Sequence, residues 1–173
     1  MLLYIRHSEA DDKSRYVDDP KLTRDGKYMA YHQGKKLIKK YGIPTTIYCS
    51  PFLRTRHTLK YMLYGLTPGQ KASINIIIEP RISRFFRRSE QRRCDVHRST
   101  LDEKIPVKEN TDIFFKRIKI AAKFFHKGVK SDGVVWCITH TTVYKRVAKL
   151  YKIELPSHIP YMDYFMTPKN FYA

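Results

Sequence analysis

The chain has 173 residues, enough for one domain with its own hydrophobic core. Hydrophobic residues make up 42% of it, which excludes a wholly disordered protein. Its 34 lysines and arginines against 16 acidic residues give a net charge of +18, which favours anionic partners such as nucleic acid or phosphorylated substrates. Three cysteines without metal-ligand spacing give no support to a disulfide framework or a metal site.

The apolar run over residues 2–5 stops at Arg6 and has no basic segment before it, unlike a signal peptide. No apolar run reaches the roughly 20 residues that a membrane-spanning helix needs. We therefore expect an intracellular, cytoplasmic protein that forms a single domain over residues 1–173. The sequence leaves its oligomeric state open.

Taken in chain order, the sequence predicts strands that alternate with helices. Short apolar runs predict strands over residues 2–5, 45–49, 74–78 and 134–139, with a last strand within 161–167. Capping residues, glycine stops and apolar periodicity predict helices over residues 23–41, 51–64, 111–127 and 141–151. This alternation predicts an α/β fold, a three-layer α/β/α sandwich with a mainly parallel central sheet.

Basic residues follow the predicted strands at the points where the strands end. Arg6 and His7 end the first strand, Ser50 follows the second and leads to Arg54, and His140 ends the fourth. Because ligands of such sheets bind beyond the carboxyl ends of the strands, we expect these side chains to line one pocket. Arginine forks and helix N-termini, after Ser50 and after His140, suit phosphate, and a neutral histidine can attack phosphorus. Such a pocket needs no metal and no cofactor.

Four short segments at predicted strand–helix junctions carry a recognisable pattern. They read LYIRHSE at residues 3–9, LTRDG at 22–26, SPFLRTRHT at 50–58 and ITHT at 138–141. In this order they resemble the Arg-His-Gly, Leu-Thr-x-x-Gly, Ser-Pro-x-x-Arg and Ser-His-Gly motifs of the histidine phosphatase, or phosphoglycerate mutase-like, superfamily, in its compact branch. The resemblance implies a phosphoglycerate mutase-like fold and a metal-independent phosphatase. It also implies that His7 is the nucleophile and forms a phosphohistidine, that Arg6 and Arg54 bind phosphate, and that His140 completes the pocket.

The chain departs from the family pattern at three positions. Ser8 and Thr141 stand where the family has glycine, and a hydroxyl at either place could contact the phosphate. Arg84 stands where many members have a glutamate as general acid, and arginine does not give up its proton in proteins. A missing acid would favour substrates with good leaving groups, or make the protein catalytically weak. The carboxylates that could replace it are Glu79, Glu90 and Asp95.

Residues 79–108 show no clear periodicity and are rich in arginine. In the family this segment overhangs the pocket and sets specificity, so Arg84, Arg87 and Arg88 are candidates for selecting a strongly anionic phosphorylated small molecule or phosphoprotein; a merely solvated loop would have the same composition. A mutase is less favoured, because it needs a dependable acid. The alternative of another class is a weak or inactive phosphate-pocket module that binds nucleic acid or phosphoprotein through its basic surface.

Overall fold

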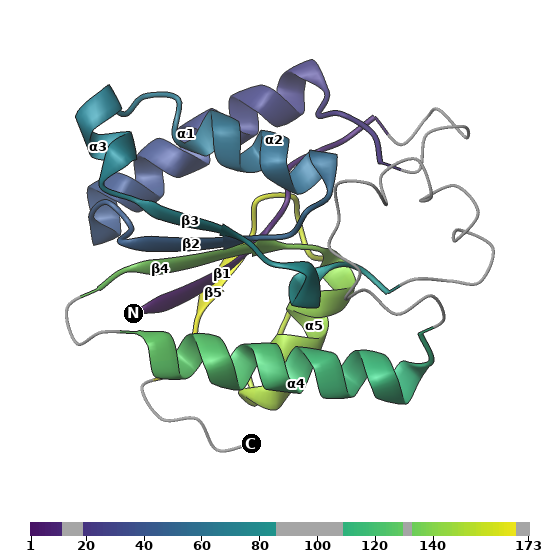
Figure 1. Ribbon diagram of the computed structural model, residues 1–173. Helices are drawn as coiled ribbons and strands as arrows, with labels where there is room; N and C mark the ends of the chain where they lie inside the picture. The colour runs from purple at the N-terminus through teal and green to yellow at the C-terminus, as the bar shows by residue number, and fades with distance from the viewer. Residues whose placement is uncertain (12–18, 86–108, 130–132, 169–173) are drawn as a thin grey trace.

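The computed structural model describes residues 1–11, 19–85, 109–129 and 133–168, in which a five-stranded sheet lies between two layers of helices (Figure 1). The strand order is β3–β2–β4–β1–β5; β1 to β4 are parallel, and β5 runs antiparallel to β1. This confirms the predicted sandwich with its mainly parallel sheet. The strands are β1 (Leu2–Arg6), β2 (Thr46–Cys49), β3 (Asn75–Ile78), β4 (Val135–Thr139) and β5 (Tyr164–Met166).

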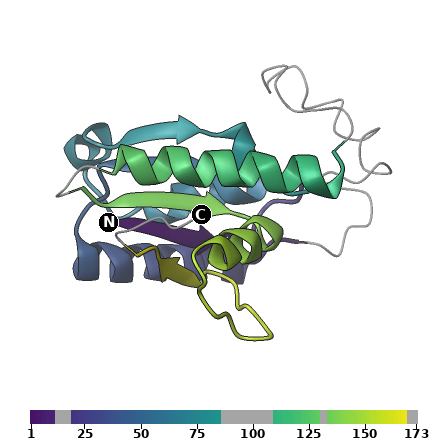
Figure 2. The same cartoon turned by 90° about the horizontal axis from the view of Figure 1, so that it is seen from below.

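Helices cover both faces of the sheet. One face carries α1 (Arg24–Tyr41), α2 (Leu53–Met62) and the short α3 (Pro68–Ala72). The other face carries α4 (Thr111–Gly128) and α5 (Thr141–Leu150), which lie in front of the sheet in Figure 2. No helix among the described residues is long and apolar enough to cross a membrane.

Two hydrophobic cores lie on the two faces of the sheet. Successive residues of each central strand alternate between them: Leu3 and Ile5 of β1 pack on the α1–α2 side, whereas Leu2 and Tyr4 pack on the α4–α5 side. All five residues of β4 are buried. A strand covered on both faces has no polar side to show, which explains why the predicted strands are almost wholly apolar.

Glycines set how α1 meets its neighbours. The Thr23 side chain caps α1 by accepting a hydrogen bond from the backbone N–H of Gly26. A Cβ atom at Gly26 would lie 2.1 Å from the backbone oxygen of Glu9, so only glycine fits below the end of β1. Further along, a Cβ atom at Gly34 would lie 2.2 Å from the backbone oxygen of Met62, so α1 and α2 pack unusually close together.

The structure differs from the prediction in two local respects. The helix expected directly after Ser50 begins only at Leu53, because the Ser50 side chain bonds to His140 instead of capping the helix. Two short elements, α3 and the 3₁₀ turn η1 (Pro80–Ile82), were not predicted, since three to five residues are too few for a periodic pattern.

Candidate functional site

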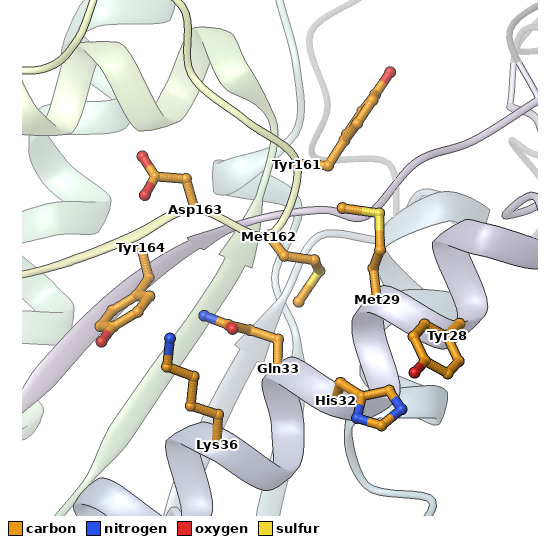
Figure 3. A pocket seen from close by; sticks show the side chains of 9 residues that line it. All are labelled: Tyr28, Met29, His32, Gln33, Lys36, Tyr161, Met162, Asp163 and Tyr164. Atoms are coloured by element: carbon orange, nitrogen blue, oxygen red, sulfur yellow. The ribbon is translucent and has the colours of Figure 1, made fainter.

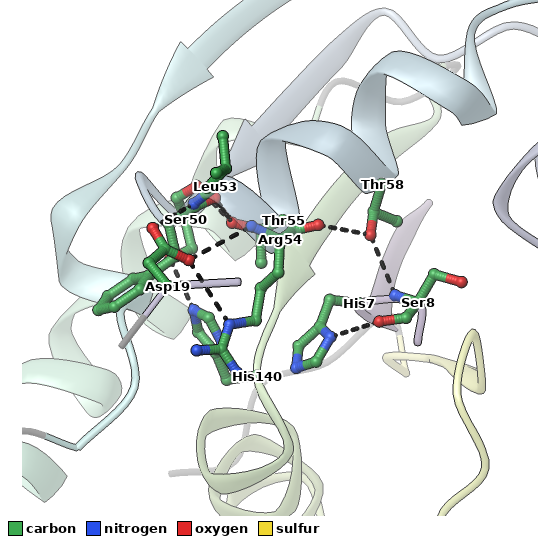
Figure 4. Close-up of polar contacts among 10 residues, drawn as sticks. His7, Ser8, Asp19, Ser50, Leu53, Arg54, Thr55, Thr58 and His140 are labelled. Atoms are coloured by element: carbon green, nitrogen blue, oxygen red, sulfur yellow. Dashed lines mark hydrogen bonds and ion pairs between the residues drawn. The ribbon is translucent and has the colours of Figure 1, made fainter. Parts of the chain in front are cut away.

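The residues expected to form one pocket come together beyond the carboxyl ends of β1, β2 and β4 (Figure 4). The rings of His7 and His140 have their centroids 5.3 Å apart. Arg54 reaches the same place from the first turn of α2. All three side chains are buried, with residue exposures of 5%, 3% and 7%. The sheet edge therefore places two imidazoles and a guanidinium in one small volume.

His7 is held as a neutral imidazole of defined tautomer. Burial, together with the charges of Arg54, Arg6 and Arg84, lowers the pKa of His7 to about 3. Its Nδ1 lies 2.7 Å from the backbone oxygen of Ser8. A carbonyl oxygen can only accept, so Nδ1 carries the proton and donates it. The lone pair is therefore on Nε2, the atom that a nucleophilic histidine would use.

His140 is buried beside it and is also neutral. Burial, followed by the nearby His7 and the positive charges of Arg54 and Arg84, lowers the pKa of His140 well below its usual range. Its Nε2 lies 2.9 Å from the Ser50 hydroxyl, which explains why that serine is not free to cap α2. Its Nδ1 is buried with no hydrogen-bond partner among the described residues.

Arg6 borders the pocket from the end of β1. Its guanidinium donates to the backbone oxygen of Ile159 and lies over the ring of Tyr161, 4.2 Å from the centroid. The Tyr161 ring also lies 6.0 Å from that of His7, centroid to centroid. Tyr161 was not among the predicted site residues; its place at the pocket depends on the chain returning beside β1 just before β5.

Arg54 is held by a carboxylate from the irregular segment before α1. Oδ1 of Asp19 lies 3.6 Å from Nε of Arg54, and the two side chains are largely buried. The same carboxylate accepts hydrogen bonds from the backbone N–H groups of Leu53, at 2.5 Å, and of Arg54, at 3.4 Å. Asp19 thus occupies the start of α2, which we had expected to offer its amides to phosphate. Asp19 and Leu53 lie 34 positions apart, so no local spacing could have revealed this contact.

Arg84 lies close enough to both histidines for its charge to lower their pKa values. Its guanidinium packs over the ring of Phe52, 5.3 Å from the centroid, and that ring also contacts His140. Two long-range bonds fix the turn that precedes it: Arg117 donates to the backbone oxygen of Arg81 at 2.6 Å, and Thr139 donates to that of Ile82 at 2.7 Å. Arg84 therefore joins the pocket from the side of η1.

No family model and no curated protein matches the chain by sequence, but solved structures match it well. The ecdysone phosphate phosphatase of Bombix mori, in complex with tungstate, superposes with a TM-score of 0.62 at 22% identity over 94% of this chain and 86% of its own. The phosphoglycerate mutase of Bacillus anthracis gives 0.64 at 14% identity over 94% and 86%, and the protein histidine phosphatase SixA complexed with tungstate gives 0.57 at 16% over 93% and 83%. The chain has the histidine phosphatase fold. The resemblance seen in the four motifs is thereby confirmed for the architecture.

Several residues of the histidine phosphatase motifs prove to be structural. Thr58 accepts a hydrogen bond from the backbone N–H of Ser8 and donates to the backbone oxygen of Arg54. The Ser8 hydroxyl donates to the backbone oxygen of Gly26 at 2.7 Å. This corrects the expectation that Ser8 contacts phosphate: its hydroxyl is fully buried and ties β1 to α1. Thr141 is the first residue of α5 and remains a candidate.

Glu79 is a poor replacement for the missing acid. Its carboxylate accepts from the Arg81 guanidinium at 2.8 and 2.6 Å and also from the Arg81 backbone N–H. Arg81 thus already occupies both oxygens of the Glu79 carboxylate. The other expected acids and specificity residues, Glu90, Asp95, Arg87 and Arg88, lie outside the described residues.

A groove of about 470 Å³ lies between α1 and the segment that leads into β5 (Figure 3). Met29 and Met162 project into its middle, Tyr161 lies at one end, and Tyr28 and His32 line its outer edge. Tyr161 lines one end of this groove and also packs against Arg6. No three His, Cys, Asp or Glu side chains of the described segments are grouped so that they could hold a metal ion.

Proposed function

We propose that this protein is a metal-independent phosphatase that hydrolyses phosphomonoesters or phosphoramidates through a phosphohistidine on His7. The observation that carries the proposal is the state of His7: a buried, neutral imidazole whose Nδ1 proton is held by Ser8. This leaves the Nε2 lone pair available beside Arg54 and His140. The solved phosphatases with this fold, two of them complexed with tungstate, support the same reading.

In the first step Nε2 of His7 attacks phosphorus, and the bond from phosphorus to the leaving group breaks, the leaving group keeping the electron pair. Arg6, Arg54 and Arg84 stabilise the negative charge on the phosphoryl oxygens. If Ser50 donates to Nε2 of His140, Nδ1 of that ring carries a proton toward the same oxygens. In the second step water attacks phosphorus, the N–P electron pair returns to Nε2, and the proton from water passes to the phosphate or to solvent.

The preferred substrates would have good leaving groups. Arg84 lies beside the two histidines where an acid was expected, and Arg81 holds Glu79. A leaving group that departs without a proton, such as an aryl oxide or the carboxylate of an acyl phosphate, needs no general acid. The arginines at the pocket and in the segment that follows Arg84 further favour a strongly anionic substrate.

Arg84, which stands where a general acid was expected, also supports the second candidate, a catalytically weak module that retains the phosphate pocket. One assay separates the two. We expect wild type to release phosphate from an aryl phosphate, His7→Ala to lose this turnover, and His158→Ala, an exposed control histidine, to retain it. An alkyl phosphate should turn over about 10²–10⁴-fold more slowly than the aryl ester. Equal rates for wild type and His7→Ala would contradict the phosphatase and favour the module.

A further inference from the structure

Five aromatic rings form a continuous row on the layer of α1 and α2, and two of them, Tyr28 and His32, also line the groove along α1. The rings of Tyr28 and His32 are 4.1 Å apart, those of His32 and Tyr31 5.1 Å, those of Tyr31 and Tyr64 6.2 Å, and those of Tyr64 and Tyr61 6.5 Å, all between centroids. We call Tyr28, Tyr31, His32, Tyr61 and Tyr64 the ring surface. It belongs to no part of the proposed phosphatase machinery.

The close contact of the two helices brings this row together. Gly34 lets α1 approach the backbone of Met62, so Tyr31 meets the residues just after α2. Tyr28 and Tyr64 are each 66% exposed, more than any other large hydrophobic side chain of the described residues. A side chain so exposed adds little to the free energy of folding, since it removes little apolar area from water. Packing therefore does not explain why rings stand at these two positions of the row.

Cations accompany the rings. The Nζ of Lys35 lies 5.4 Å from the centroid of Tyr31, and that of Lys27 lies 5.9 Å from the centroid of Tyr61. Within α1 and α2 the only acidic residue is Asp25. The exposed basic side chains of the two helices, apart from this pair, are Arg24, Lys36, Lys39, Lys40, Arg56 and Lys60.

We propose that the ring surface binds single-stranded nucleic acid, with bases stacking on Tyr28 and Tyr64 and backbone phosphates lying at Lys27 and Lys35. Exposed rings interleaved with cations are what a single strand requires, because each base offers a flat face and each nucleotide one negative charge. An anionic membrane or an acidic protein would also be attracted by the cations, but neither presents a series of flat faces, each next to a negative charge, as a single strand does. The net charge of +18 adds long-range attraction for any polyanion.

Fluorescence anisotropy with a labelled single-stranded oligonucleotide that has hydroxyl groups at both ends tests this, because such a probe has no terminal phosphate for the histidine pocket. We expect Tyr28→Ala combined with Tyr64→Ala to raise Kd about tenfold or more, as for the loss of base stacking. The pair Tyr28→Phe and Tyr64→Phe keeps the rings and should bind like wild type. Ile120→Ala with Phe124→Ala is the matched control, since it removes two equally exposed apolar side chains, each 50% exposed, on α4.

Hydrolysis of an aryl phosphate at the wild-type rate by the tyrosine variants would show that they remain folded, and melting temperature serves the same purpose if the protein is inactive. The proposal is overturned if the alanine pair binds like wild type or if the α4 control weakens binding equally. It is also overturned if double-stranded DNA binds more tightly than the single strand, or if anionic vesicles bind and the oligonucleotide does not. Loss of turnover in His7→Ala with unchanged oligonucleotide binding is expected, because the two sites are separate.

Discussion

The two helices that begin at the pocket, α2 and α5, start in different ways. At α2 the Asp19 carboxylate accepts hydrogen bonds from the first backbone N–H groups, those of Leu53 and Arg54. At α5 the cap position is His140 itself, and no side chain of the residues that the structure describes accepts a hydrogen bond from the first backbone N–H groups. An amide that already has a carboxylate partner is not available to a phosphate. A helix N-terminus at a pocket is therefore an anion site only if the fold leaves it uncapped.

The two helices would therefore bind phosphate through different groups. α2 would contribute through the Arg54 side chain, which Asp19 orients, and α5 would contribute through its backbone amides and the His140 ring. The contribution of each helix to phosphate binding can be tested separately.

On the side of α2, Arg54→Ala should lower kcat/KM for an aryl phosphate by about 10²–10³-fold, as for loss of a main transition-state donor. Arg54→Lys should recover only part of this, because an ammonium cannot bind phosphate with a two-pronged fork. The control Arg56→Ala changes an exposed arginine of the same helix and should have little effect. Steady-state kinetics measure all three, and an Arg54→Ala rate near that of wild type would show that α2 holds no phosphate.

On the side of α5, Thr141→Pro removes the backbone N–H of the first helical residue. Proline is tolerated there, and His140 before it already has the extended conformation that a following proline requires, with φ −108° and ψ 157°. We expect inhibition by inorganic phosphate to weaken about tenfold, the usual contribution of a charged hydrogen bond, while the melting temperature is kept.

Thr141→Ala is the control for that substitution, since it keeps the amide and removes the hydroxyl. If the alanine variant weakens inhibition as much as the proline variant, the side chain and not the backbone is the donor. Unchanged inhibition in both variants would remove α5 from the account.

Asp19→Ala should mainly lower the stability of the protein and, in addition, reduce its activity. Losing a helix-start partner costs about 1 kcal/mol, which lowers Tm by about 2–4 °C in a domain of this size. Freed from Asp19, Arg54 should bind substrate less well, so KM should rise more than kcat falls. Asp25→Ala, an exposed aspartate in the first turn of α1, is the control, and thermal melts with kinetics distinguish the two effects. An Asp19→Ala protein that melts and turns over like wild type would show that Asp19 does not organise α2.

The buried neutral histidines predict a pH effect on stability. Burial, with the nearby arginine charges, lowers the pKa of His7 to about 3 in the folded chain, whereas an unfolded histidine titrates near 6.5. Between these values the unfolded chain binds more protons, so the free energy of unfolding falls as pH drops below about 6.5, by roughly 1 kcal/mol per pH unit for this group. Urea unfolding at pH 7 and pH 5 measures it. His7→Asn should lose less stability on acidification than wild type does, and an equal loss would contradict a neutral His7.

Local patterns predicted the frame of this pocket well. Short, wholly apolar runs predicted the central strands, which are covered on both faces, and Thr23 with Gly26 predicted the start of α1. The proximity of the histidines and arginines could also be predicted, because parallel strands bring their carboxyl ends to one edge of the sheet. Contacts between distant segments were the ones missed: Asp19 at α2, Ser50 bonded to His140 across 90 positions, and Arg117 fixing the turn before Arg84.

Ser8 shows that a motif position alone can also suggest a contact that the fold does not make. Its position in the motif suggested a phosphate contact, yet its hydroxyl bonds to a backbone oxygen of α1. The tyrosines of the ring surface were also missed, because the spacing of three residues between Tyr28 and Tyr31, and between Tyr61 and Tyr64, is common in helical sequences. Only the contact of α1 with α2 brings them into one row.

The most direct test of the account is to trap the phosphoenzyme. Wild type mixed with an aryl phosphate and quenched rapidly in alkali should carry one phosphoryl group that is stable to base and labile to acid, and fragment mass spectrometry should locate it on His7. Arg54→Ala should accumulate less of this species, and His7→Asn none. A phosphoryl group on another residue, or hydrolysis without any trapped phosphohistidine, would contradict the central claim that His7 receives the phosphoryl group.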